Sequence, residues 1–197
     1  MFAANTRSAV LSALLVVPGV SGIPGAAAAR ATETAIPLPE HPRPDFARSE
    51  WQNLNGPWAF RFDKAEVGER EGWPTAALDS FPLTISVPFP WGSPLSGVED
   101  EADVAWYART IRAPESWAGQ RIFLVVGASD WETTAWLDGR PLGRHRGGYD
   151  PFELELTPAL VAGREALLVV RVDDKARSFK LEGKQGAGAI FVVALLA

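Results

Sequence analysis

The chain contains no cysteine, which excludes a disulfide framework and thiolate metal sites. Its two histidines, His41 and His145, lie far apart and do not show the close spacing typical of metal ligands. No phosphate-binding loop or dinucleotide fingerprint is present. The formal net charge of -5 argues against a nucleic-acid partner, which requires a basic face to neutralise phosphates. We therefore expect no metal, no cofactor and no nucleic-acid partner.

The sequence also lacks an apolar run of the roughly 20 residues that a membrane-spanning helix needs. A shorter apolar run at 9–17 follows Arg7, and four alanines stand at 26–29. This order of charge, apolar core and small residues predicts a secretory signal peptide over residues 1–29. The alternative is a disordered alanine-rich leader. The first interpretation predicts a secreted or periplasmic protein that is not anchored in a membrane.

The remaining sequence is rich enough in hydrophobic residues, 47% over 197 positions, for one domain with a sizeable core. A proline-rich linker is expected at 30–45. Beyond it, short apolar or alternating runs are separated by Gly, Pro, Asn and Asp, which is typical of an all-β sandwich or barrel. The expected strands are 58–63, 83–87, 104–111, 121–126, 133–137, 152–156 and 166–172.

The most informative segment, 128–153, combines an alternating strand, an Asp138-Gly139 turn, a second short segment and a polar-aromatic loop. Other motifs precede and follow it in a fixed order. They are HPRP at 41–44, WQNLNGPW at 51–58, FRFD at 60–63, VPF at 87–89, WYAR at 106–109, WAGQR at 117–121 and GKQG at 183–186. Together these motifs resemble the N-terminal sugar-binding domain of glycoside hydrolase family 2, over about 41–186.

The resemblance implies a jelly-roll-like β-sandwich of the galactose-binding-domain type at 46–186. It also implies a parent that hydrolyses β-glycosides by a retaining mechanism, with its two catalytic carboxylates in a later barrel domain. Because this chain ends before such a barrel, we expect a non-catalytic accessory domain whose partners are carbohydrate and the barrel of its parent. The alternative is a stand-alone secreted carbohydrate-binding module. Specificity for galactosides, glucuronides or mannosides is left open.

A sugar site needs an apolar platform for the C–H face of the ring and a few polar groups for its hydroxyls. Asp130, Trp131 and Glu132 offer both. The resemblance implies that the loop around Asp130 reaches the substrate pocket, so Asp130 is the expected hydroxyl acceptor and Trp131 the stacking neighbour. Alternatively, Asp130 and Glu132 pair locally while Trp131 packs inward.

The second candidate site is the loop at 144–150, which contributes Arg144, His145 and Tyr149 around paired glycines. The alternative is a scaffold loop whose arginines form solvated ion pairs with Asp150 and Glu153. A separate acidic cluster, at 99–101, is expected to be a solvated loop and not a catalytic pair. Adjacent loop residues rarely hold the carboxylate separation that glycoside hydrolysis requires.

Two further features have alternative interpretations. Trp91 lies either on an exposed loop or in the core, whereas Trp106 and Trp136 are expected in the core. At 187–197 the sequence departs from the strand that closes the sheet in the family. The apolar run at 190–197 either supplies a substitute closing strand or is an altered end, and an unpaired run of this kind would promote aggregation. The departure also removes a segment from which some relatives contribute a substrate-pocket carboxylate.

Overall fold

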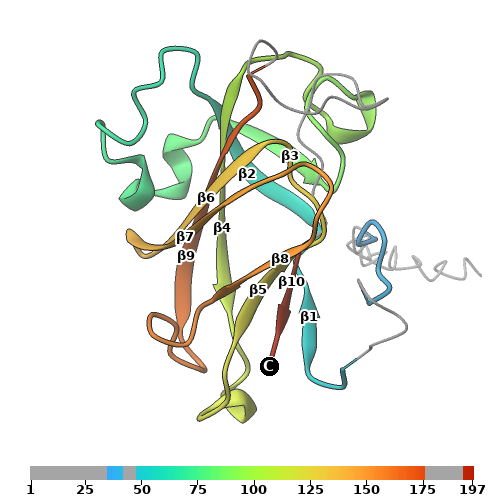
Figure 1. Ribbon diagram of the computed structural model, residues 1–197, viewed down its shortest axis with the longest axis vertical. Helices are drawn as coiled ribbons and strands as arrows, with labels where there is room; N and C mark the ends of the chain where they lie inside the picture. The colour runs from blue at the N-terminus through green and yellow to red at the C-terminus, as the bar shows by residue number, and fades with distance from the viewer. Residues whose placement is uncertain (1–34, 42–47, 176–192) are drawn as a thin grey trace, which may run out of the picture. The chain divides into compact units, whose positions relative to one another are not determined.

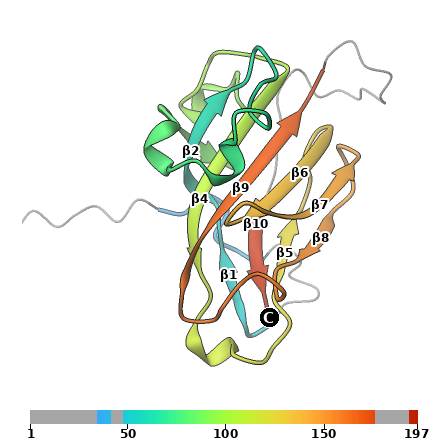
Figure 2. The ribbon, with the colours of Figure 1, turned by 90° about the vertical axis from the view of Figure 1, so that its left-hand side faces the viewer.

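Alternating apolar side chains build two antiparallel sheets, shown from two sides in Figures 1 and 2. The computed structural model describes residues 35–41, 48–175 and 193–197, which belong to the compact unit Thr34–Ala197. Its strands are β1 (Trp51–Asn53), β2 (Gly56–Phe62), β3 (Leu83–Val87), β4 (Val104–Arg112), β5 (Phe123–Val126), β6 (Glu132–Leu137), β7 (Arg140–Arg146), β8 (Phe152–Glu155), β9 (Glu165–Asp173) and β10 (Val193–Leu196). Short 3-10 turns are η2 (Trp73–Thr75), η3 (Leu78–Ser80), η4 (Pro94–Ser96) and η5 (Glu115–Trp117).

The strand order is β1-β10-β5-β8 in the four-stranded sheet and β3-β2-β4-β9-β6-β7 in the six-stranded sheet. All seven strands expected from the sequence are present, with no end shifted by more than two residues, and the expected all-β sandwich is confirmed. The Asp138-Gly139 turn is also confirmed: both residues have positive φ, and Leu137 pairs with Arg140 across the turn.

The main core lies between the sheets and takes side chains from both. Trp58 and Phe60 of β2 alternate with outward-facing neighbours, and Leu124 and Leu195 enter from the other sheet. Trp91 is only 1% exposed and joins this core, so the core interpretation of this residue is correct.

A smaller apolar cluster covers the outer face of the six-stranded sheet. Trp106 of β4 stacks on Trp136 of β6 with 5.2 Å between ring centroids, and Trp73 of η2 contacts Trp106 edge-on. Both strand tryptophans are buried, as expected, but in this second cluster and not between the sheets. Segment 63–82, which contains Trp73 and Phe81, therefore shields an aromatic face that would otherwise meet water.

The apolar C-terminal run supplies an interior strand. β10 pairs antiparallel with β1 on one side and with β5 on the other, and all four of its residues are buried. Of the two alternatives for this run, the substitute strand is the one observed at 193–196. The predicted signal peptide at 1–29 and the GKQG motif at 183–186 lie outside the described residues, as does most of the predicted linker.

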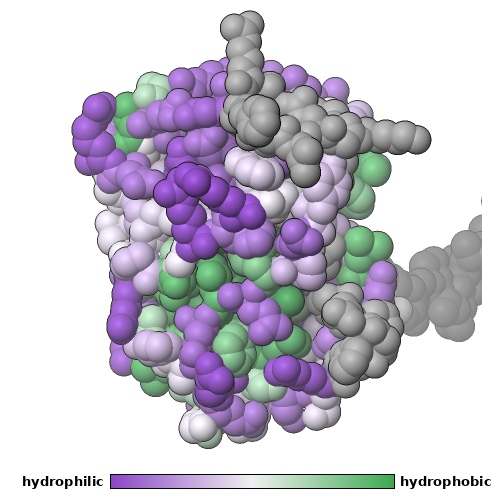
Figure 3. Space-filling model, viewed as in Figure 1, coloured by the Kyte–Doolittle hydropathy of each residue, from purple (hydrophilic) through white to green (hydrophobic). Residues whose placement is uncertain are grey.

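The outer face of the four-stranded sheet mixes apolar and charged side chains (Figure 3). Arg121 lies over the ring of Phe123, 4.8 Å from its centroid, and donates two hydrogen bonds to Glu155 on β8. A long charged side chain therefore covers part of the apolar surface of β5. Within the described part of the chain, no helix is both long and apolar enough to span a bilayer.

Candidate functional site

The residues proposed from the sequence gather at one end of the six-stranded sheet, called here the site end. At this end β2 and β9 finish while β4 and β6 begin. Asp173 pairs with both Val104 and Glu132, and the amide of Asp63 donates to the carbonyl of Val104 at 2.9 Å. Antiparallel pairing thus brings segments that are far apart in the sequence to one edge.

Asp130 and Trp131 stand directly before β6 and are fixed by main-chain contacts. Their peptide bond is cis. The Trp131 amide donates to Asp173 at 3.3 Å, and the Trp131 carbonyl accepts from Gly147 at 2.9 Å. A Cβ at Gly148 would lie 2.8 Å from the carboxyl carbon of Asp130, so only glycine allows this approach. The 130–131 segment and the 147–148 loop are therefore packed as one unit, with Asp130 buried and Trp131 half-buried.

Glu132 pairs locally, as the alternative interpretation of this residue proposed. Its carboxylate accepts from Arg146 at 2.6 Å and contacts Arg144, both on the adjacent strand β7. Within the described residues, neither arginine pairs with Asp150 or Glu153, so that expected pairing was wrong. The reason is register: Glu132 lies opposite Arg146, and side chains two positions apart on β7 point to the same face.

Burial alone would raise the pKa of Glu132, but hydrogen bonds and positive charge from Arg144 and Arg146 outweigh it and hold the pKa below its ordinary value. Stabilisation by this carboxylate is therefore fully present above about pH 4.5 and is lost as the pH falls through the lowered pKa. Glu132→Gln is expected to cost about 1–3 kcal/mol of unfolding free energy at pH 7. It should also flatten the decline of stability that the wild type shows below about pH 4.5.

Urea unfolding between pH 7 and pH 3 measures this effect, with the exposed Glu99→Gln as the matched control. Equal pH profiles for Glu132→Gln and the wild type would show that the arginine pairs contribute nothing to folding.

The second candidate segment is partly strand and partly loop. Arg144, His145 and Arg146 belong to β7, so the expected loop is shorter than proposed and begins at Gly147. The Asp138-Gly139 turn sets up the hairpin that pairs them with β6. His145 stacks on Phe152 with 4.1 Å between centroids, and its buried Nε2 has no hydrogen-bond partner within the described residues. Tyr149 is 51% exposed, and Arg144 is exposed as well, so both are accessible to a ligand.

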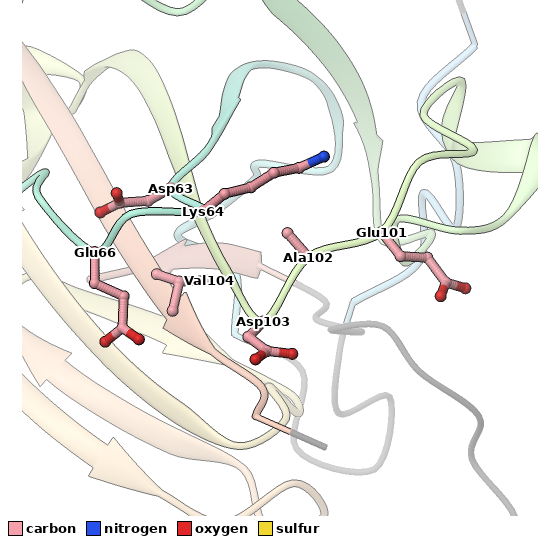
Figure 4. A pocket seen from close by; sticks show the side chains of 7 residues that line it. All are labelled: Asp63, Lys64, Glu66, Glu101, Ala102, Asp103 and Val104. Atoms are coloured by element: carbon pink, nitrogen blue, oxygen red, sulfur yellow. The ribbon is translucent and has the colours of Figure 1, made fainter. Parts of the chain in front are cut away.

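An acidic pocket of about 310 Å³ also opens at the site end (Figure 4). It is lined by Asp63, Lys64, Glu66, Glu101, Ala102, Asp103 and Val104. Sequence reasoning proposed none of these as site residues, although it noted the acidic segment 99–101, which is exposed as expected. No grouping of side chains suited to a metal ion occurs among residues that the structure describes.

Asp63 has a structural role in this pocket. Its carboxylate accepts hydrogen bonds from the amides of Val67 and Gly68, at 2.8 and 2.9 Å, and from the indole of Trp106 at 3.0 Å. These three donors hold the start of segment 63–82 against the sheet. The carboxylate points away from Lys64 (Figure 4), so it does not neutralise that cation.

Comparison with known proteins identifies relatives of this arrangement. A β-glucuronidase from Paenibacillus borealis is 29% identical over 131 residues, covering 66% of this chain and 22% of the relative. The dog β-glucuronidase is 29% identical over 136 residues, covering 62% of this chain and 20% of the relative. The chain therefore spans about a fifth of the length of these curated relatives.

A solved structure of β-glucuronidase from Ruminococcus gnavus shares the fold. It superposes with a TM-score of 0.63 at 20% identity, over 77% of this chain and 30% of the other. The family model described as "Glycosyl hydrolases family 2, sugar binding domain" matches residues 51–185. This chain belongs to the sugar-binding domain family of the family 2 glycosyl hydrolases.

Proposed function

We propose that this chain is the non-catalytic, carbohydrate-binding accessory domain of a secreted family 2 β-glycosidase. The match of 51–185 to the sugar-binding family carries the proposal. In the parent protein, a catalytic barrel would hydrolyse the O-glycosidic bond with its own two carboxylates. The relatives named as β-glucuronidases make β-glucuronides the first substrates to test. Secretion rests on the charge and alanine pattern of residues 1–29.

Asp130, Trp131 and Tyr149 are the proposed sugar contacts at the site end. Trp131 is half-buried and Tyr149 exposed, so their rings can offer apolar faces to a sugar. Asp130 is packed against Gly148, which fixes the position of the carboxylate that would accept a hydroxyl hydrogen. Glu132, Arg144 and Arg146 are engaged with one another and are proposed to support this surface, whereas His145 positions the loop through Phe152.

A stand-alone binding module is the second candidate, and one observation favours it. β10 fills the interior position of the four-stranded sheet between β1 and β5. The four-stranded sheet therefore obtains its interior strand β10 from within this chain. The two candidates differ in affinity: an independent module binds sugar by itself, whereas an accessory domain binds it weakly or only beside its barrel.

Thermal unfolding of the chain with and without monosaccharides and β-linked disaccharides tests sugar binding, because a ligand of the folded state raises the midpoint. As an accessory domain, the chain is expected to show little or no rise by itself. A rise with one sugar class that Trp131→Ala and Asp130→Ala remove, and that the exposed Asp79→Ala retains, would instead identify the stand-alone module. A cooperative transition that no sugar shifts would reject independent binding and leave an accessory domain that acts only with its barrel.

A further inference from the structure

A second pocket lies beside the acidic one and differs from it in chemistry. Its volume is about 480 Å³, within the range of about 300–1,000 Å³ typical of small-molecule sites. It is lined by Arg61, Phe62, Asp63, Lys64, Ala65, Val67, Trp73, Pro82 and Leu83. We call it the β2-edge pocket. It contains none of the proposed sugar contacts.

One wall of the β2-edge pocket is apolar and accessible. Its apolar lining residues are Phe62, Val67, Trp73, Pro82 and Leu83. Trp73 is only 5% exposed, whereas Pro82 is exposed and Leu83 is 40% exposed. Such a wall favours a ligand with a ring, a chain or the C–H face of a sugar, because contact removes apolar surface from water.

The edge of β2 adds main-chain polar groups to this pocket. The β2–β3 ladder ends at the pair Phe60–Leu83, whereas β2 continues through Arg61 and Phe62. On their other side these two residues pair with Trp106 and Ala105 of β4. The edge that faces away from β4 therefore presents peptide groups beyond the reach of the β3 ladder, where a ligand can form hydrogen bonds.

The charges lining the pocket leave an excess of positive charge. Among the described residues, neither Arg61 nor Lys64 has a carboxylate within ion-pair distance. The guanidinium carbon of Arg61 lies over the Trp73 ring, 3.7 Å from its centroid. Asp63 is 3% exposed and directs its carboxylate to Val67, Gly68 and Trp106. The pocket thus combines two cations with an apolar wall, a pairing that complements an anion carried on an apolar body.

We propose that the β2-edge pocket binds a small organic carboxylate whose acid group contacts Arg61 and Lys64 and whose apolar face packs on Pro82 and Leu83. Both an acidic sugar and an aryl acid have this chemistry. The proposal is independent of sugar binding at the site end, because the two surfaces share none of the residues assigned to ligand contact.

Proton–nitrogen NMR titration of the folded chain tests the proposal with 3-phenylpropanoate, its neutral alcohol 3-phenylpropan-1-ol, and methyl β-D-glucuronide. We expect at least one of the two carboxylates to shift the NMR signals of the Leu83 amide and the Trp73 indole. If the aryl acid is the ligand, the alcohol should bind about tenfold more weakly than 3-phenylpropanoate. Arg61→Gln and Lys64→Gln should each weaken binding about fivefold or more, whereas the distant Arg112→Gln should not.

Each outcome separates the sources of the ligand or rejects the site. Shifts with the glucuronide alone identify an acidic sugar, and shifts with 3-phenylpropanoate alone identify an apolar acid. Lys64→Gln serves as the second variant because Arg61→Gln also removes the stacking on Trp73. The proposal is overturned if neither carboxylate shifts these signals, if the alcohol binds as well as 3-phenylpropanoate, or if both variants bind like the wild type. Shifts confined to Asp130 and Gly148 would instead support the site end alone.

Discussion

Leu195→Asp is expected to abolish or severely weaken cooperative folding. Leu195 is fully buried in β10, where it pairs with Leu124 of β5 and Gln52 of β1 and belongs to the main core. An aspartate there would place an unpaired charge between the two sheets. The expected loss is about 4–5 kcal/mol, which approaches the whole stability of many domains. Urea unfolding followed by far-UV circular dichroism measures it.

Leu95→Asp is the matched control, since it makes the same chemical change at a leucine that is 67% exposed in η4. This variant should unfold within about 0.5 kcal/mol of the wild type. If Leu195→Asp retained the wild-type midpoint, β10 could not be an interior strand, and the run at 193–196 would have to lie outside the core.

The strands that were predictable from the sequence are those with apolar side chains at alternate positions or in short buried runs. β4 and β9 are the clearest, and each lies inside the six-stranded sheet with neighbours on both sides. β7 was missed as a strand because its residues are largely polar and include Pro141 and Gly143. β7 pairs with β6 through the Asp138-Gly139 turn, so the turn, and not the residues of β7, indicated the hairpin in the sequence.

The candidate site was predictable only where its contacts are local. Glu132, Arg144 and Arg146 come from one hairpin, but the sequence pattern assigned Glu132 to one candidate site and the arginines to another, with the wrong partners for the arginines. Asp63 gave no such signal. Its bond to Trp106 joins residues 43 positions apart, and only the sheet topology brings them together.

Asp63→Ala is expected to destabilise the domain by about 3 kcal/mol and to release segment 63–82 from the sheet. The substitution leaves the amides of Val67 and Gly68 and the Trp106 indole without their acceptor, and each unsatisfied buried donor costs about 1–3 kcal/mol unless water replaces the carboxylate. Urea unfolding measures the loss of stability. Amide hydrogen exchange should accelerate most in 63–82, because this segment would open before the sheets do.

Asp79→Ala, in the same segment but exposed, tests whether any loss of an acidic residue has this effect, and it should leave both exchange and stability near the wild type. Uniform acceleration across β4 and β9 in Asp63→Ala would contradict a local role and show that Asp63 supports the whole sheet. Selective opening of 63–82 would also move Trp73 away from Trp106 and dismantle the apolar wall of the β2-edge pocket. Carboxylate binding there should then fall in parallel with exchange protection, although Asp63 itself offers the ligand no charge.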